Sequence, residues 1–367
     1  MKKIFALLLA LCMMGACAMA ETVNQVDEPV LNIFTWEGYI DYSTVIQPFE
    51  AETGIKVNYA TFASNEEMYE KLSAVNGGDY DIILARDYML NMTREAGLMQ
   101  KFDPAIVTNY ANIDPAFTSQ FFDPTNEYVA PYVAGIPLIV YDPAVVEKEI
   151  KGFNDLWDPA LADTLGLIDD ARVTIGMVLL SMGQSMNTTD EAVLAEAAAK
   201  LETLKANIHV LEYENLHNYL VSGDIGVAYT FTPFVAMALD ANPDLTVVWP
   251  EEGLGFGIDG CFIPVNAPHA KNANMFLEFL MRPEIAAISA EWQYYCSPNA
   301  AAFDVLSDAY KARYEFMGIF DRKDDAEILM DLPVEDEQKF QDISPQRRRQ
   351  GGRWQVQSHQ SHNGARC

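Results

Sequence analysis

Short apolar runs alternate with amphipathic stretches along most of the chain. Runs typical of buried strands lie at residues 31–35, 55–62 and 80–85. Between the last two, residues 65–75 carry apolar side chains at helical spacing, and Asn76-Gly77-Gly78 interrupts the pattern. Strands that alternate with helices form one sheet with helices on its faces. The pattern therefore predicts an α/β fold with largely parallel sheets.

The same alternation continues in the second half of the chain. We predict strands at residues 135–142, 225–230 and 245–249, and helices at residues 190–206, 270–281 and 283–292. A length of 367 residues is enough for two domains of usual size.

The N-terminus has the features of an export signal. Lys2-Lys3 precedes an uncharged apolar run that ends at Ala18-Met19-Ala20, so we assign residues 1–20 to the signal and 21–30 to a flexible lead. The run is short for a membrane span, which needs about 20 residues. In the alternative interpretation, Cys17 is the acylated first residue of a lipoprotein. Both interpretations place the protein in the periplasm or on the outer face of the cytoplasmic membrane.

The C-terminal residues 344–367 differ from the rest in composition. They contain five arginines and no aspartate or glutamate, in a chain whose net charge is −29. Such a segment cannot bury enough apolar surface to fold, so we predict a disordered tail, of the kind that a frameshift produces. A basic interaction tail is the alternative.

Charge and cysteine content exclude some classes of protein. A net charge of −29 disfavours nucleic acid or an anionic membrane as partner, and suits a cationic ligand. Outside the signal the cysteines are Cys261, Cys296 and Cys367, too few for a disulfide scaffold. We expect Cys261 and Cys296 to be lone thiols, with a bridge between them as the alternative.

Several motifs lack the context that their chemistry needs. Gly255-Phe256-Gly257-Ile258-Asp259-Gly260 matches a dinucleotide-binding pattern, but a strand follows it instead of a helix, so we predict a turn with Asp259 near the surface. Tyr294-Tyr295 is similar to paired tyrosines that bind ferric iron. The histidines at 209, 217 and 269 are predicted to be surface or capping residues. No nucleophile elbow or P-loop occurs, so no catalytic residue, metal or cofactor is predicted.

The segment Phe34-Thr35-Trp36-Glu37-Gly38-Tyr39 carries the clearest candidate chemistry. It places two aromatic rings around a carboxylate where a strand ends, which suits a small organic cation. Arg86-Asp87-Tyr88 follows another strand. Ligands of α/β sheets bind beyond the carboxyl ends of strands, so both segments are expected at one site.

These and other motifs resemble the spermidine/putrescine-binding proteins of ABC importers. The resemblance rests on Thr35-Trp36-Glu37-Gly38-Tyr39-Ile40, Thr53-Gly54-Ile55-Lys56-Val57, Ser64 to Leu72, Tyr80-Asp81-Ile82-Ile83, Asp169-Asp170-Ala171-Arg172, Val247 to Gly253 and Ser297-Pro298-Asn299, in that order. It covers residues 31–343.

The resemblance implies a two-lobed, type II periplasmic-binding-protein fold, in which each lobe has a mixed, mostly parallel sheet flanked by helices and a hinge joins the lobes. Lobe one would hold residues 31–134 and 261–302, lobe two residues 135–260, and a helical segment residues 303–343. It implies a monomeric receptor that captures putrescine or spermidine and delivers it to a membrane permease. An exported enzyme, with Asp170 or Asp259 as general base, is the alternative from another class.

Family pocket positions fall on eleven residues. They are Trp36, Glu37, Tyr39, Arg86, Tyr88, Asp170, Val173, Tyr229, Gly257, Asp259 and Tyr295. Asp259 matches the acid that pairs with a ligand amine, and Trp36, Tyr229 and Tyr295 match aromatics that enclose its methylenes. Asp87 supplies a further carboxylate, and a buried polyamine requires one carboxylate for each charge.

The departures from the family pattern leave the ligand open. Val173 replaces a glutamate, Gly257 a tryptophan and Arg86 a small hydroxyl residue, while Glu37 and Asp87 stand where hydroxyls are common. In one account Asp87 or Glu37 neutralises Arg86 and the cleft is shortened. In the other, Arg86 binds the carboxylate of a zwitterion such as an amino acid. Another small amine and ferric iron remain as further alternatives.

Overall fold

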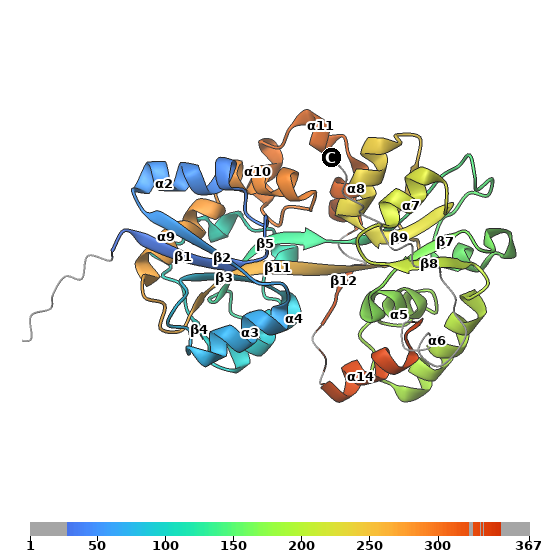
Figure 1. The fold of residues 1–367 in the computed structure, drawn as a ribbon, viewed down its shortest axis with the longest axis horizontal. Helices are drawn as coiled ribbons and strands as arrows, with labels where there is room; N and C mark the ends of the chain where they lie inside the picture. The colour runs from blue at the N-terminus through green and yellow to red at the C-terminus, as the bar shows by residue number, and fades with distance from the viewer. Residues whose placement is uncertain (1–27, 323–325, 331, 333, 346–367) are drawn as a thin grey trace, which may run out of the picture.

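The computed structural model describes residues 28–322, 326–330, 332 and 334–345, which form two lobes side by side (Figure 1). The predicted signal, most of the predicted lead, Cys17, and residues 346–367 of the predicted tail with Cys367 lie outside the described residues. Within the described residues, no helix combines the length and the apolar character that crossing a membrane requires.

The first lobe is built on a seven-stranded sheet with the order β12-β11-β3-β1-β2, in which β4 and β5 also pair with β11. Its strands are β1 (Val30–Thr35), β2 (Lys56–Thr61), β3 (Ile82–Arg86), β4 (Met99–Gln100), β5 (Val129–Gly135), β11 (Leu254–Pro264) and β12 (Ala326–Ile328). The parallel pairs are β1 with β2, β1 with β3, and β11 with β12.

Helices cover both faces of this sheet, with α2 and α10 on one side and α3 and α4 on the other (Figure 1). They are η1 (Tyr42–Ile46), α2 (Gln47–Thr53), α3 (Asn65–Ala74), α4 (Asp87–Glu95), η2 (Asn109–Asn112), η3 (Pro115–Phe117), α9 (Ala270–Leu280), α10 (Pro283–Gln293) and η6 (Ala300–Asp304). The Ser64 side chain caps α3, and Gly54 ends α2 in the left-handed conformation, with φ 74°.

The second lobe is built on a five-stranded sheet with the order β10-β6-β9-β7-β8. Its strands are β6 (Pro137–Tyr141), β7 (Leu165–Ile168), β8 (Ile208–Glu212), β9 (Val227–Phe231) and β10 (Thr246–Val248). Its helices are η4 (Phe153–Trp157), η5 (Pro159–Leu161), α5 (Ala171–Leu180), α6 (Glu191–Leu204), α7 (Leu216–Ser222) and α8 (Thr232–Ala241). Every residue of α5 is buried.

Each sheet mixes parallel and antiparallel pairs. In the described residues, every antiparallel pair of strands involves β6 or β11. The alternation of strands and helices in the sequence predicts the parallel pairs, but it does not indicate these antiparallel ones. The two sheets flanked by helices agree with the α/β architecture that the sequence predicts.

Strand β11 does not contain the turn predicted at Gly255 to Gly260. These residues are part of one continuous strand, and from Gly257 onward they pair with β3 and β5 of the first sheet. Asp259 is therefore held inside a sheet, with its side chain 14% exposed, instead of lying near the surface. Residues 257–260, assigned to lobe two from the sequence, hydrogen-bond within the sheet of lobe one.

The C-terminal segment touches both lobes. After α11 (Asp308–Lys311), α12 (Tyr314–Met317) and α13 (Ile319–Arg322), strand β12 joins β11, and α14 (Val334–Ile343) packs against α5 and α6. The sequence predicts a helical segment here and misses β12. Ser344, assigned to the disordered tail, is buried.

Cys261 and Cys296 are both buried thiols with no disulfide between them, which confirms the expectation from the sequence. The Cys296 thiol donates a hydrogen bond to the carbonyl oxygen of Phe316, at 2.8 Å.

Candidate functional site

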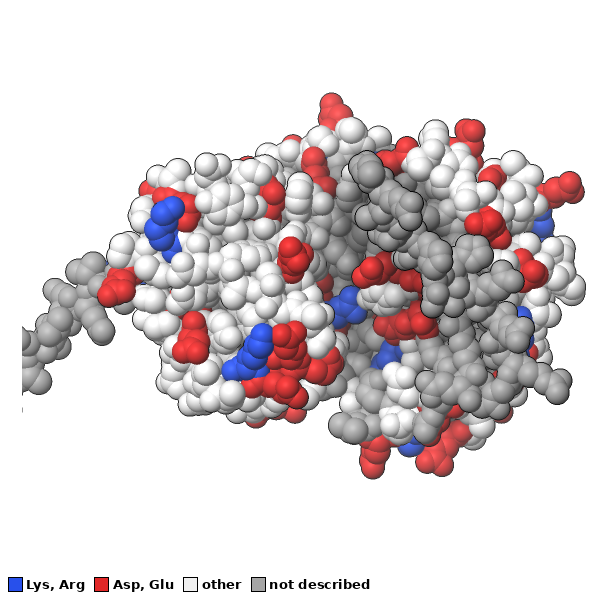
Figure 2. All heavy atoms as spheres, viewed as in Figure 1, with Lys and Arg blue, Asp and Glu red and all other residues white. Residues whose placement is uncertain are grey.

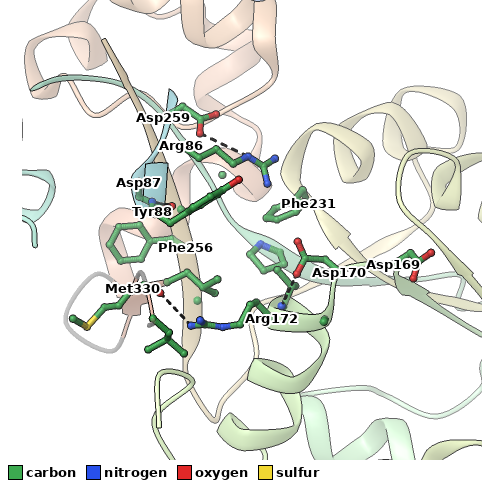
Figure 3. A pocket seen from close by; sticks show the side chains of 18 of the residues that line it. Arg86, Asp87, Tyr88, Asp169, Asp170, Arg172, Phe231, Phe256, Asp259 and Met330 are labelled. Carbon is green, nitrogen blue, oxygen red and sulfur yellow. Dashed lines mark hydrogen bonds and ion pairs between the residues drawn. The ribbon is translucent and has the colours of Figure 1, made fainter. Parts of the chain in front are cut away.

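A cavity of about 740 Å³ lies between the lobes (Figure 3). Its charged lining residues are Glu66, Arg86, Asp87, Asp169, Asp170, Arg172 and Asp259, and its aromatic ones are Tyr88, Phe231, Phe256 and Tyr295. Acidic side chains are scattered over both lobes on the face that Figure 2 shows, and basic ones are fewer there. The five carboxylates and two guanidinium groups of the lining give the cavity an acidic character.

The ends of strands place most of the charged groups, as the fold class predicts. Arg86 ends β3, and Asp87 begins α4 directly after it. Asp170 follows β7 and caps α5, where its Oδ1 accepts a hydrogen bond from the backbone N–H of Val173 at 3.0 Å. In Figure 3, Asp170 points toward the cavity and Asp169 points away from it.

Asp259 lies opposite Arg86 in the pairing of β11 with β3. The Arg86 Nε is 4.0 Å from its Oδ1, and the hydroxyl of Tyr39 donates a hydrogen bond to its Oδ2. Burial raises the pKa of Asp259 above its ordinary value, and the Arg86 charge and the Tyr39 hydrogen bond oppose that shift. The carboxylate predicted to be the central acid thus already has a charged partner within the protein.

Arg86 connects the two lobes. Its Nη2 donates a hydrogen bond to the hydroxyl of Tyr213, at 2.8 Å, and Tyr213 directly follows β8 in the second lobe. The sequence-based account paired Arg86 with Asp87 or Glu37, but the ion pair that the structure shows is with Asp259. The register of β3 against β11 causes the difference, because it sets Arg86 directly across from Asp259.

Asp87 is only 6% exposed yet lines the cavity. Its Oδ1 accepts the backbone N–H of Tyr88 at 2.8 Å, and its Oδ2 accepts that of Ile258 at 3.2 Å. Burial, with a further contribution from the Asp259 charge, raises the pKa of Asp87 to about 7 although these hydrogen bonds lower it. The charge of Asp87 therefore changes near neutral pH.

Tyr88 is held by two neighbours at the start of α3. Its hydroxyl accepts a hydrogen bond from Asn65 Nδ2 at 2.9 Å and donates one to Glu66 Oε1 at 3.1 Å. The ring is consequently fixed as one wall of the cavity (Figure 3).

The segment from Trp36 to Tyr39 lies beside the cavity and does not line it. The Trp36 ring packs at 4.9 Å from the rings of both Tyr39 and Phe62, and Glu37 is exposed. Tyr39 reaches the site through its hydrogen bond to Asp259. The structure therefore brings Tyr39 to the site, and leaves Trp36 and Glu37 outside the lining.

Tyr229 is a core residue and does not line the cavity. It is 1% exposed and its ring packs edge-on against Phe153, with centroids 5.5 Å apart. Phe231, two residues further along the same face of β9, lines the cavity instead. The rule that sites lie at the carboxyl ends of strands could have identified Phe231, because it is the last residue of β9.

The two adjacent tyrosines face different surroundings. Tyr295 lines the cavity, whereas Tyr294 ends α10 with φ 56° and its ring lies 6.2 Å from that of Phe316. A ferric site of the expected kind would need both hydroxyls together. Among the described residues, no group of three or more His, Cys, Asp or Glu could hold a metal ion.

Arg172 is a cavity residue that the sequence reasoning did not assign to the site. Its Nη2 donates to the Asn187 Oδ1 at 3.1 Å and to the Met330 carbonyl at 3.3 Å, and its guanidinium lies 4.5 Å from the ring centroid of Phe340. Met330 and Phe340 belong to the C-terminal segment. No motif in the sequence indicates that this segment returns to the cavity, so Arg172 and its partners could not be placed together.

The three histidines lie outside the cavity lining. His209 contacts Asp163, and His217 stacks on Phe234. His269 precedes α9 and contacts Asp81 through both its backbone N–H and its ring.

Two α/β lobes with a polar cavity between them define the class of solute-binding receptors. The chain belongs to the family described as bacterial extracellular solute-binding protein, whose model matches residues 44–318. The two-lobed fold predicted from the sequence is thereby confirmed, and the members of this family are solute-binding proteins.

Particular relatives agree with this assignment. The chain is 36% identical over 295 residues to the spermidine/putrescine-binding periplasmic protein of Escherichia coli, covering 80% of this chain and 84% of that protein. It is 30% identical over 332 residues to a putrescine-binding periplasmic protein of Pseudomonas aeruginosa, with coverages of 85% and 89%. A solved spermidine/putrescine ABC transporter substrate-binding protein from Streptococcus pneumoniae superposes with a TM-score of 0.80 at 31% identity, covering 86% of this chain and 97% of that chain.

Proposed function

We propose that this protein is the receptor of an ABC importer, and that it captures a linear polyamine between its lobes and delivers it to a membrane permease. The observation that carries the proposal is the lining of the cavity, which contains five carboxylates, two guanidinium groups and four aromatic rings. A linear polyamine combines ammonium groups with methylenes, and this lining offers partners for both.

Both guanidinium groups already have partners within the protein. Arg86 contacts Asp259 and Tyr213, and Arg172 is hydrogen-bonded to Asn187 and packed on Phe340. An uncompensated anionic ligand would meet the remaining carboxylates, and like charges in a partly buried cavity repel. The net charge of the lining therefore favours a cation.

The apolar walls suit the methylene part of such a ligand. Tyr88 comes from the first lobe and Phe231 from the second, so the two rings approach the cavity from opposite sides (Figure 3). Rings from both lobes contact a ligand fully only when the lobes are close together, which links binding to closure. The names of the relatives, which are spermidine- and putrescine-binding proteins, support the same ligand class.

A zwitterion with an amine and a carboxylate is the second candidate. The observation that favours it is the position of Arg86 in the lining, where its side chain keeps 36% exposure. In that case the guanidinium would bind the ligand's carboxylate as a fork, and an acid of the cavity would bind its amine.

Calorimetric titration with matched ligands tests the two candidates. Putrescine, 4-aminobutyrate and butylamine share a four-carbon chain and differ in one end group. We expect putrescine to bind at least about tenfold more tightly than the other two, since each buried charge needs its partner. Tighter binding of 4-aminobutyrate than of putrescine would contradict the polyamine proposal.

The proposed receptor acts without catalysis. Mass spectrometry of putrescine recovered after long incubation with the protein is expected to show an unchanged mass, whereas conversion of the putrescine would support an exported enzyme.

We propose in addition that the protein is a monomer. Size-exclusion chromatography with light scattering measures its oligomeric state. Mass analysis of the exported protein distinguishes cleavage after Ala20 from lipidation at Cys17.

A further inference from the structure

We propose that Asp87, left uncovered by Gly257, is the carboxylate that receives an ammonium group of the ligand, while Asp259 serves to hold Arg86. The assignment rests on the proposed function as a receptor for a linear polyamine. It reverses the expectation from the sequence, in which Asp259 is the partner of the amine.

Asp259 is engaged by groups of the protein itself. Arg86 stands directly across from it in the β3 to β11 pairing, with Nε at 4.0 Å, and Tyr39 donates a hydrogen bond to its other oxygen. A guanidinium remains charged at any physiological pH. A ligand ammonium would have to compete with a cation that is tethered next to the acid, and a tethered group acts at a high effective concentration.

Asp87, by contrast, has only uncharged hydrogen-bond partners. They are the backbone N–H groups of Tyr88 and Ile258. In the described part of the chain, no lysine or arginine forms an ion pair with its carboxylate. A carboxylate that is 6% exposed and lacks an ion pair gains strongly from a cation brought to it.

Gly257 gives the cavity access to this carboxylate. A Cβ atom at position 257 would lie 3.4 Å from Asp87 Oδ2, so a larger side chain there would extend over the acid. Gly257 and Asp87 both line the cavity, and Gly257 lies in β11 without a positive φ, so its missing side chain is not required by the backbone. The glycine therefore opens the space above the acid.

A second carboxylate faces the cavity from the other lobe. Asp170 caps α5 and accepts a hydrogen bond from Val173 N–H, a neutral donor. An ammonium group at Asp87 and another at Asp170 would join the lobes through one linear diamine, whose methylenes would contact Tyr88 and Phe231. The ligand class that this arrangement takes is a linear diamine, with one end in each lobe.

A set of charge variants separates the roles of the two acids. Putrescine affinity is measured by calorimetry for wild type, Asp87→Asn, Asp259→Asn and the double variant Arg86→Ser/Asp259→Asn. We expect Asp87→Asn to lose about 100-fold or more in affinity, because an ammonium group would be buried without its charged partner. Asp259→Asn alone should also weaken binding, because Arg86 then adds an uncompensated positive charge.

The double variant is the decisive one. If Asp259 only neutralises Arg86, removing both returns the affinity to within about tenfold of wild type, and the two changes are strongly non-additive. If Asp259 is itself the partner of the amine, the double variant stays as weak as Asp259→Asn. That result, or an Asp87→Asn variant with wild-type affinity, overturns the assignment.

A series at position 257 provides a test that changes no charge. Gly257→Ala adds only a Cβ at ordinary contact distance and should keep putrescine affinity within about threefold, since small apolar changes cost little. Gly257→Val covers Asp87 and should lower it about tenfold or more, while the melting temperature reports whether each variant folds. Equal putrescine affinities of the two variants would contradict the proposal.

A different result would overturn the proposed function. If the wild-type protein binds neither putrescine nor spermidine, the proposed function is wrong, and this assignment with it.

Discussion

The hydroxyl of Tyr39 donates a hydrogen bond to the carboxylate of Asp259, a residue 220 positions later in the sequence. The contact ties the loop after β1 to the middle of β11, and it orients a buried acid whose other oxygen faces Arg86. Tyr39 is therefore connected to the cavity through Asp259, although its own ring packs on Trp36 outside it.

Replacement of Tyr39 by phenylalanine should destabilise the protein. The change leaves Asp259 buried with one donor fewer, and a hydrogen bond to a charged group contributes about 1.5–3 kcal/mol. We expect the free energy of unfolding, measured by denaturant titration, to fall by about that amount. Tyr42→Phe is the matched control, because Tyr42 is 56% exposed and its substitution should change stability by less than about 0.5 kcal/mol.

The raised pKa of Asp87 predicts how stability depends on pH. Asp87 titrates near its ordinary value in the unfolded chain and at about 7 in the folded protein, so the folded state binds more protons between these values. Its contribution to stability is fully present at low pH and is lost as the pH rises through 7. Asp87→Asn removes this contribution, so its unfolding free energy should rise relative to wild type between pH 4 and about 7. If the difference in unfolding free energy between wild type and Asp87→Asn is the same at every pH from 4 to about 7, Asp87 does not titrate in that range.

Ligand binding should release protons near neutral pH. An ammonium group beside Asp87 stabilises its charged form, and the nearest charged residues that act on this acid are Asp259 and Arg86. Putrescine affinity is therefore expected to increase as the pH rises through 7. Calorimetry at pH 6.5 in buffers with different ionisation enthalpies measures the protons released. Asp87→Asn should show little release, and equal release by both proteins would contradict the prediction.

Arg86→Ser should change the preferred length of the ligand. Arg86 occupies the space between Asp259 and Tyr213, and serine frees both the space and the acid. We expect spermidine affinity to increase relative to that of putrescine in calorimetric titrations. Tyr213→Phe is the control, because it removes the hydrogen bond to Arg86 and leaves the guanidinium in place. A loss of zwitterion binding without any gain for spermidine would favour the second candidate ligand.

Truncation after Pro345 should leave the stability and the ligand affinity of the protein unchanged. The residues that follow carry no apolar periodicity with which to dock. Composition alone places the cut after residue 343, but Ser344 is buried, so the cut is moved two residues further along the chain. The melting temperature and the putrescine affinity of residues 21–345 are expected to equal those of the longer chain. A large decrease in either would show that the tail contributes a folded element.

Local sequence patterns predicted much of the fold. The strands β1, β2 and β3 and the helix α3 follow from apolar spacing and from the break at Asn76-Gly77-Gly78, because each is decided by neighbours in sequence. Strand β12 was missed because three residues form it and its only described strand partner, β11, lies about 70 residues earlier. Pairing at that range depends on where the chain returns, which local patterns do not encode.

The candidate site was predicted in part for the same reason. Arg86, Asp87, Tyr88 and Asp170 end a strand or lie within two residues of its end, so their presence at the cavity follows from the fold class. Tyr229 lies earlier on its strand and is covered, while Phe231 at the strand end is open. The pairing of Arg86 with Asp259 depends on the register of β3 against β11, and a shift of one residue would have turned the side chains to opposite faces.

The position of β11 also determines the order in which the lobes can form. The second sheet uses strands from one continuous stretch, residues 137–248, and so it can assemble as soon as that stretch exists. The first sheet must wait, because β3 remains unpaired along one edge until residues 254–264 have been made. During synthesis from the N-terminus, the first lobe therefore exposes an open edge that can pair with another chain. Its completion over such a long sequence separation is expected to be the slow step of folding.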